Sequence, residues 1–282
     1  MRLARRLHAA GVPVVYYISP QIWAWKRGRR HQMAAWCRRL LCIFPFEPAH
    51  FADTTLDVRF VGHPLLENLA AERDPSLVRD PDLVLLLPGS RRSEVERLLP
   101  DLVRTAAVLR ERHPALRFVL PAPRERVAEI ARQCLACGGL AGLVDVQIDV
   151  GRTHHWMQRA AAGIAASGTV TMEAAILGLP LVSVYRLAPL THALGRLVLR
   201  GLPYFTIVNL VAGREVFAEF LQGEVRAERL VPALEAILPG GSRRGEVEAG
   251  MAAAVTALGA ATAVSRTAAR LVLEVAGEAP SL

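Results

Sequence analysis

Cysteine is scarce in this 282-residue chain, which contains only four. Their positions, Cys37, Cys42, Cys134 and Cys137, are unevenly spaced, and no signal peptide precedes them. A disulfide framework needs more cysteines at regular spacings, so we expect reduced thiols and a cytoplasmic protein. The pair Cys134 and Cys137 also matches half of a zinc site or a redox pair. No second close pair completes a zinc site, so we expect structural thiols and no metal.

Lysine is rarer still, because only Lys26 among the 34 Lys and Arg residues is a lysine. The formal net charge is +8 at pH 7, and the sequence pI is about 10.1. Such a charge suits nucleic acid or an anionic membrane as a partner. Because the arginines are scattered, and neither a recognition motif nor an aromatic stacking platform accompanies them, we expect no nucleic-acid partner.

Long uninterrupted apolar runs are also missing, although 52% of the residues are hydrophobic and 21% are charged, as in globular proteins. The longest apolar stretch, residues 160–185, contains Glu173 and Pro180, so the sequence predicts no transmembrane helix. A chain of 282 residues is long enough for two domains that each bury a core.

Patterns typical of strands and helices alternate on both sides of one break in composition. The break, residues 67–82, is rich in Glu, Arg and Asp, and we place the domain boundary there. Apolar, often β-branched runs predict strands at 12–18, 40–44 and 58–61 before the break, and at 83–87, 117–120 and 143–150 after it. An Ala-rich helix is predicted at 246–275. This alternation predicts an α/β fold with parallel sheets, in which ligands bind at the carboxyl ends of the strands.

Residues 164–185 read as a strand, a tight turn, a short helix and a second strand. Small residues at Ser167 and Gly168 form the turn, and the helix that follows presents free N–H groups and its positive dipole end, where an anion fits. Glu173 is the only charged residue in the stretch, so it needs a partner. The hydroxyls of a ribose are one candidate. The other interpretation is a capped helix in an α/β core, with Glu173 paired to an arginine.

A second polar turn, residues 88–93, follows the predicted strand at 83–87. Ser93 and Glu96 match a capping box, which predicts that a helix begins at Ser93. Arg91 lies just before that helix, where it can reach a phosphate.

Two segments have the composition of a membrane interface. Trp23 and Trp25 precede four cations, which suits a lipid interface or a phosphorylated ligand, and equally a helix with core-facing tryptophans. In the predicted helix 189–200, His192, Arg196 and Arg200 share one face opposite an apolar one. Most helices with this pattern simply pack on their own domain, so both interpretations stay open.

Seven strings, in order along the chain, resemble those of the lipid-A-disaccharide synthase family. They are S-P-Q-I-W-A-W at 19–25, F-P-F-E at 44–47, F-V-G-H-P-L at 60–65, L-P-G-S-R-x-x-E at 87–94, A-S-G-T-x-x-x-E at 166–173, Y-R at 185–186 and N-L-V-A-G-R-E-V at 209–216. The resemblance covers essentially the whole chain.

The resemblance implies a GT-B fold, in which two Rossmann-like domains with parallel sheets face a cleft. The expected domains are a partial N-terminal, acceptor-side domain at 1–66, a linker at 67–82, a UDP-sugar-binding domain at 83–245, and C-terminal helices at 246–282 that cross back to the N-terminal domain. Members of the family begin with a further N-terminal stretch, so the N-terminal domain is expected to be incomplete.

The resemblance also implies an activity, which is the transfer of 2,3-diacylglucosamine from UDP to 2,3-diacylglucosamine 1-phosphate with inversion, and without a metal or other cofactor. The donor diphosphate would lie at Ser167, Gly168 and Thr169, and the ribose at Glu173. Arg91 would neutralise the departing phosphates. The further substrate-binding residues implied are Ser90, Glu94, Arg186, Asn209 and Glu215.

In the family an Asp serves as the general base, and its expected position is upstream of Met1. Two hypotheses follow, an active glycosyltransferase or an inactive UDP-binding fragment. The expected partners are the UDP-linked donor, the lipid acceptor, an anionic inner-membrane surface and a second copy of the chain. The expected location is the cytoplasm, at the periphery of the inner membrane.

Overall fold

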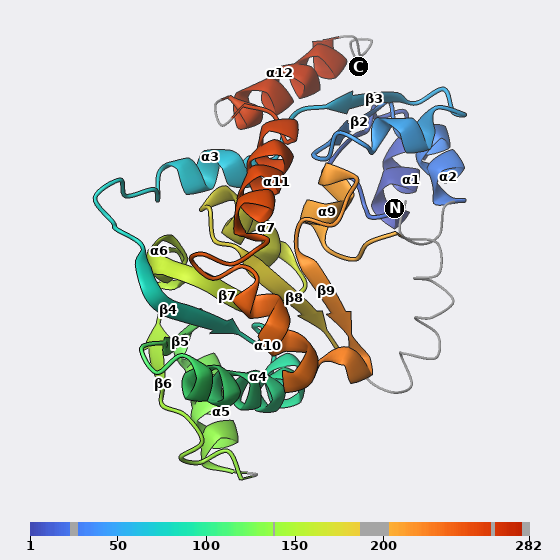
Figure 1. The fold of residues 1–282 in the computed structure, drawn as a ribbon. Helices are drawn as coiled ribbons and strands as arrows, with labels where there is room; N and C mark the ends of the chain where they lie inside the picture. Colours follow the sequence, from blue (N-terminus) through green and yellow to red (C-terminus); the bar gives the residue numbers. More distant parts are fainter. Residues whose placement is uncertain (23–27, 138, 187–202, 261–262, 278–282) are drawn as a thin grey trace. The chain divides into compact units, whose positions relative to one another are not determined.

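A computed structural model describes residues 1–22, 28–137, 139–186, 203–260 and 263–277, and contains two compact units (Figure 1). The described residues up to Ala71, together with those from Thr256 onward, form the first unit. The described residues from Glu72 to Val255 form the second unit, which contains most of the chain.

The first unit is built on a three-stranded parallel sheet of order β1-β2-β3. The strands are β1 (Val15–Tyr17), β2 (Arg39–Cys42) and β3 (Asp57–Phe60). Its helical segments are α1 (Arg2–Ala9), α2 (Arg29–Trp36), η1 (Pro48–Phe51), α3 (Pro64–Ala70) and α12 (Val264–Gly277).

Both faces of the central strand β2 are covered, because successive side chains point to opposite faces. Leu40 is fully buried in a cluster with Met33 of α2 and Phe51 of η1. Leu41, on the opposite face, is buried against Ala268 of α12. The first unit therefore combines segments from both ends of the chain around one sheet.

A buried arginine also joins α12 to this sheet. Arg39 is 8% exposed, and its Nε donates to Asp57 Oδ2 at 2.6 Å. Its Nη1 donates to the carbonyl of Leu271 at 2.8 Å and to Glu274 Oε2 at 3.0 Å. Burial of this cation is tolerated because two carboxylates and a carbonyl replace its water.

The second unit has a six-stranded parallel sheet of order β6-β5-β4-β7-β8-β9 (Figure 1). The strands are β4 (Asp80–Leu87), β5 (Arg117–Ala122), β6 (Val146–Val150), β7 (Ala160–Ala166), β8 (Leu181–Tyr185) and β9 (Ala218–Leu221). The helical segments are α4 (Arg92–Arg112), α5 (Glu125–Ala136), α6 (Thr153–Arg159), α7 (Thr169–Ile176), α9 (Ile207–Ala212), η2 (Gln222–Glu224), α10 (Ala227–Glu235) and α11 (Arg244–Ala257). Helices α4, α5 and α10 pack on one face of this sheet, and α6 and α7 on the other.

Several predicted elements have different bounds in the structure. The strand expected from Ile164 begins at Ala160, directly after α6. The Ala-rich helical tail expected at 246–275 contains the helices α11 and α12, and Ala263 just before α12 has a φ of +68°. The short helix α9 and the short strand β9 had no predicted counterpart. The α/β architecture with parallel sheets is confirmed.

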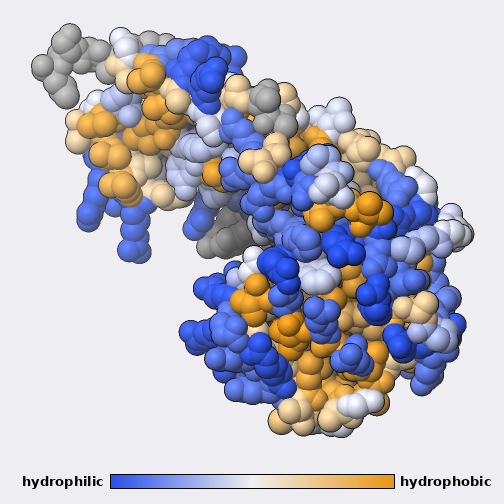
Figure 2. Space-filling view, turned by 90° about the vertical axis from the view of Figure 1, so that its left-hand side faces the viewer, coloured by the Kyte–Doolittle hydropathy of each residue, from blue (hydrophilic) through white to orange (hydrophobic). Residues whose placement is uncertain are grey.

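Hydrophilic side chains cover much of the face in Figure 2, with smaller hydrophobic patches between them. Many exposed arginines are in ion pairs with neighbouring carboxylates, as Arg92 is with Glu96 and Arg132 with Glu125. The high positive charge of the chain is therefore partly neutralised at short range.

Candidate functional site

The strand order of the second unit brings two loops of the predicted site together. The chain runs outward from β4 to β5 and β6, then returns to β7 on the other side of β4. Leu87 at the end of β4 pairs with Ala165 near the end of β7. The turns that follow these strands, at 88–91 and 167–168, therefore lie next to each other at the switch point, which is where ligands bind in such sheets.

The first of these turns is shaped by Glu94. Its Oε2 accepts hydrogen bonds from the backbone N–H groups of Ser90 at 3.0 Å and Arg91 at 3.2 Å. Gly89 has a φ of +114°, and a Cβ there would lie 2.4 Å from Glu94 Oε2, so only glycine fits. Glu94 thus holds the turn over the start of α4.

The predicted capping box of Ser93 and Glu96 is wrong. Helix α4 begins one residue earlier, at Arg92, so Glu94 is its third residue and performs the capping. Glu96 instead accepts a hydrogen bond from Arg92 at 2.9 Å.

Arg91 projects from the same turn into solvent. Its side chain is 79% exposed, and its Nη1 lies 2.6 Å from Glu94 Oε1. An exposed ion pair of this kind contributes about 1 kcal/mol or less, so the guanidinium can exchange Glu94 for a phosphate at little cost.

The second turn exposes the start of α7. Ser167 donates its backbone N–H to the carbonyl of Val184 at 2.9 Å, and Thr171 Oγ1 donates to the carbonyl of Gly168 at 2.8 Å. No side chain caps the helix, and Gly168 and Thr169 are exposed. Within the described residues, the first N–H groups of α7 therefore lack a side-chain cap, as an anion site requires.

Glu173 lies one turn inside α7, and its side chain is 20% exposed. The partner is a histidine, because His154 Nε2 lies 3.3 Å from Glu173 Oε2. Within the described residues, a histidine therefore takes the place of the arginine partner that the alternative interpretation expected. His154 Nδ1 lies 2.5 Å from Glu72 Oε2, and the hydrogen bonds to Glu173 and then to Glu72 raise the pKa of His154 to about 9.

His154 was absent from the predicted site. It belongs to α6, which follows the carboxyl end of β6 and packs against the sheet. The adjacent pair His154 and His155 just after a predicted strand was the available signal, since ligand-binding residues gather at such ends.

The other predicted binding residues have partners inside the second unit. The guanidinium of Arg186 donates to the carbonyls of Arg97 at 3.0 Å, Gln222 at 3.3 Å and Val225 at 2.9 Å, and to the Asp101 carboxylate. Glu215 is half exposed and accepts from Arg243 Nη1 at 3.0 Å.

Asn209 of α9 is fully buried, and its amide is saturated. Its Nδ2 donates to the carbonyl of Phe217 and to Glu219 Oε1, both at 2.8 Å. Its Oδ1 accepts from the N–H groups of Val216 at 2.8 Å and Phe217 at 2.9 Å. Glu219, which the sequence did not single out, also accepts from Thr206 Oγ1 at 2.7 Å.

The predicted membrane-interface residues lie outside the described residues. These are Trp23, Trp25, His192, Arg196 and Arg200. In the described part of the chain, none of the helices combines the length and the apolarity needed to cross a bilayer. The same part contains no group of three or more His, Cys, Asp or Glu side chains arranged to hold a metal ion. All four cysteines are free thiols.

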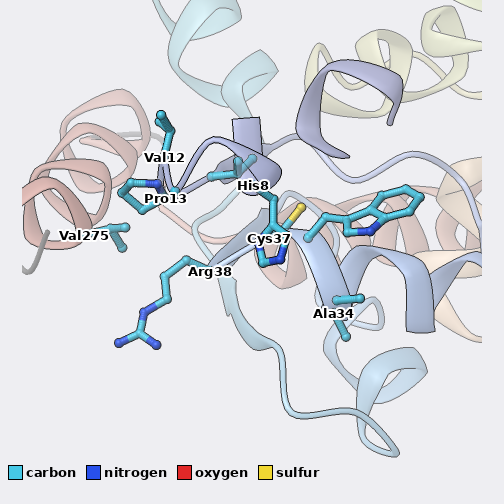
Figure 3. A pocket seen from close by; sticks show the side chains of 11 residues that line it. His8, Val12, Pro13, Ala34, Cys37, Arg38 and Val275 are labelled. Carbon is cyan, nitrogen blue, oxygen red and sulfur yellow. The ribbon is translucent and has the colours of Figure 1, made fainter. Parts of the chain in front are cut away.

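A cavity of about 400 Å³ lies in the first unit (Figure 3). Val12, Val14, Cys37 and Val275 contribute to its lining. Apart from Val275 of α12, its lining residues precede β1 or β2, so the cavity lies at the amino ends of these strands. Ligands of parallel α/β sheets bind at the opposite, carboxyl ends.

A model of the lipid-A-disaccharide synthetase family matches residues 1–274. The lipid-A-disaccharide synthase of Syntrophotalea carbinolica is 37% identical over 286 residues, which cover 99% of this chain and 71% of that protein. The enzyme of the same name from Myxococcus xanthus is 38% identical, with 95% of this chain and 70% of that protein covered.

Solved structures resemble the chain in fold. UDP-GlcNAc 2-epimerase from Neisseria meningitidis, bound to UDP-GlcNAc, matches with a TM-score of 0.56 at 12% identity over 96% of this chain and 72% of that one. MnaA from S. aureus, in a co-structure with UDP, matches with a TM-score of 0.60 at 13% identity over 99% and 72%. These structures support the GT-B fold. The family model and the curated relatives give the stronger result, which is that the chain belongs to the lipid-A-disaccharide synthase family.

Proposed function

We propose that this chain is a glycosyltransferase that moves 2,3-diacylglucosamine from UDP to 2,3-diacylglucosamine 1-phosphate and inverts the anomeric centre. The observation that carries the proposal is the uncapped start of α7 beside the Arg91 turn, with Glu173 one helical turn further in. Membership of the lipid-A-disaccharide synthase family supports the choice of donor and acceptor.

The diphosphate of the donor would accept hydrogen bonds from the first N–H groups of α7, in the turn formed by Ser167, Gly168 and Thr169. Negative charge grows on this diphosphate as the glycosidic bond to UDP breaks. Arg91 and the α7 dipole would stabilise that charge in the transition state. Ser90 and Glu94 hold the turn that presents Arg91.

Glu173 would accept hydrogen bonds from the ribose hydroxyls. Arg186 and Asn209 have their polar groups committed inside the unit, so we assign them to positioning the loops after β8 and β9. Glu215 is exposed and is proposed to contact substrate. The general base is not assigned to any residue of this chain.

We also propose a cytoplasmic location at the surface of the inner membrane, and the pairing of two copies. Support for the membrane comes from α1, on which Arg2, Arg5 and Arg6 are exposed beside Leu3, which is 68% exposed. Cations next to an exposed apolar side chain favour an anionic lipid surface.

The test has a binding arm and a turnover arm. Calorimetry should detect UDP binding to the purified chain, and Glu173→Gln should weaken the binding of UDP more than that of pyrophosphate. Equal losses for the two ligands would remove Glu173 from the ribose site. Turnover is measured as disaccharide formed from donor and acceptor in mixed micelles. Binding without turnover would favour the alternative, an inactive UDP-binding chain.

A further inference from the structure

His154 is held between two carboxylates that come from distant parts of the sequence. Its Nε2 faces Glu173 on α7 at 3.3 Å, and its Nδ1 faces Glu72, which follows α3, at 2.5 Å. The imidazole is 28% exposed, whereas Glu72 is 51% exposed. No other hydrogen bond to the Glu173 carboxylate is present among the described residues.

This geometry requires a proton on both ring nitrogens. A neutral imidazole has one nitrogen without a proton, and here its lone pair would face a carboxylate oxygen. The doubly protonated ring donates in both directions, and each bond is charge-assisted. The raised pKa of His154, about 9, has the same cause.

The segment that carries Glu72 is itself fixed to α6 and α7. Gln158, one turn after His154 on α6, donates from Nε2 to the carbonyl of Glu72 at 2.9 Å and accepts from the N–H of Asp74 at 2.8 Å. Arg73 donates to the carbonyl of Ile176 at the end of α7. Glu72 is therefore held in place through its backbone, independently of its bond to His154.

The same segment begins the second unit, since the boundary between the units lies between Ala71 and Glu72. The chain Glu72–His154–Glu173 thus connects the start of the unit to the residue proposed to bind ribose. If Glu72 only neutralised the His154 ring, it would not have to lie at the start of the unit, because any surface carboxylate near the ring could do the same.

We propose that His154 is a positioning residue of the nucleotide site, anchored by Glu72 and holding the Glu173 carboxylate in the orientation that a vicinal diol requires. The inference rests on the proposed function, because it takes Glu173 as the ribose contact. His154 bonds to Oε2 of Glu173 and leaves the remaining acceptor positions of the carboxylate for two adjacent hydroxyls. Without the imidazolium, the Glu173 carboxylate can rotate. The free-energy cost of ordering it on binding would then lower the affinity for the nucleotide.

Two variants and one control test this role. His154→Gln removes the charge and one of the two bonds, and Glu72→Gln, at an exposed position, keeps the anchor but removes its charge. His155→Gln is the control, because His155 adjoins His154 on α6 and contacts the ring of Trp156 instead. Circular dichroism checks that each variant is folded.

Calorimetry with UDP, 2′-deoxy-UDP and pyrophosphate gives the main readout. We expect His154→Gln to weaken the binding of UDP about tenfold, the worth of one hydrogen bond, and that of pyrophosphate less than about twofold. Its loss with 2′-deoxy-UDP should be smaller than with UDP, because a single hydroxyl needs less orientation. Glu72→Gln should weaken the binding of the three ligands in the same order but by smaller factors. His155→Gln should leave all three affinities unchanged.

A second readout follows the ring itself. Proton–nitrogen correlation spectra of ¹⁵N-histidine-labelled protein should show both nitrogens of His154 protonated at pH 7.5, and Glu72→Gln should lower the pKa of that ring. Equal losses for UDP and pyrophosphate in His154→Gln, or a His154 ring that is neutral at pH 7.5, would overturn the inference alone. A wild-type chain that does not bind UDP would overturn the proposed function, and the inference with it.

Discussion

Glu173 illustrates what single residues reveal at the sequence level and what they do not. Its isolation in an apolar stretch indicates that the carboxylate needs a partner. The partner, His154, lies 19 residues earlier on a different helix, and Glu72 lies a further 82 residues before it. Only the crossing of the chain from β6 back to β7 brings α6 beside α7, and no local pattern encodes that distance.

Asn209 and Arg186 show the reverse case. Their sequence context predicts ligand contact, yet each side chain finds its partners within the protein. A motif indicates that a residue type is needed at a position. Whether its polar atoms face a ligand or the backbone depends on the loops around it.

The first prediction concerns Arg91. Arg91→Ala should weaken UDP binding by about 1.5–3 kcal/mol, the usual worth of a hydrogen bond to a charged group. The protein should stay folded, since the guanidinium pairs with Glu94 at the surface and, within the described part of the chain, makes no other ion pair. Calorimetry with UDP measures the loss.

Arg92→Ala is its control, because Arg92 pairs with Glu96 along α4. An unchanged affinity in Arg91→Ala would remove Arg91 from the site, as would an equal loss in both variants.

The second prediction concerns pH. The pKa of His154 is raised from 6.5 to about 9 in the folded protein. The folded state therefore binds this proton more tightly than the unfolded state, and the resulting stability is complete below about pH 6.5 and is lost as the pH rises through about 9. Urea unfolding at pH 7 and pH 10 should show a larger decrease in the free energy of unfolding for the wild type than for His154→Gln.

Groups other than His154 also titrate over this range, so the difference between the two proteins is the meaningful quantity. A pH dependence that is identical in the wild type and the variant would contradict the assigned protonation of the ring.

At the scale of elements, strands with unusual composition were the hardest to predict. Strand β7 begins with three alanines, which favour helices, so the sequence pattern does not separate its start from α6. The fold selects small residues there because β7 is central. A Cβ on Gly163 would lie 2.9 Å from Leu181 Cδ2 and 3.2 Å from the carbonyl of Leu85. The outer strand β9 is only four residues long and partly exposed, so it lacks a clear apolar pattern.

The third prediction concerns the connection between α9 and β9. Asn209→Ala should lower the free energy of unfolding by about 2–4 kcal/mol, because it leaves buried backbone groups of Val216 and Phe217 without partners. Urea denaturation provides the measurement.

The matched control is Asn68→Ala, at an exposed position of α3. It should change the stability by less than about 0.5 kcal/mol. Similar losses in the two variants would show that the buried amide network contributes little.

At the scale of the whole molecule, the sequence predicted the fold class. Alternating patterns and the composition break predicted parallel α/β sheets, which are present in both units. The proposed membrane association rests instead on surface charge, which sequence counts describe only as a sum. Ion pairs between neighbouring residues cancel part of that sum, and folding decides which cations remain outside such pairs.

The fourth prediction tests that association. The purified chain should sediment with anionic phospholipid vesicles, and raising the salt from about 0.05 M to about 0.5 M should release it, because screening weakens surface electrostatics. Replacing Arg196 and Arg200 by Ser should reduce the bound fraction.

Replacing Arg124 and Arg126 by Ser removes the same charge from an exposed site around the start of α5, and serves as the control. An unchanged bound fraction after the Arg196 and Arg200 substitutions would mean that these residues form a solvated face.

The pairing of Arg39 with Glu274 has a consequence for synthesis on the ribosome. Translation delivers the sheet of the first unit before the second unit, but α12, which covers one face of that sheet, is made after the second unit. The second unit contains all its strands between Glu72 and Val255, so it can fold during elongation. Strands β1, β2 and β3 must wait with one face uncovered until α12 leaves the exit tunnel. The first unit would therefore complete its folding only after the whole second unit has been made.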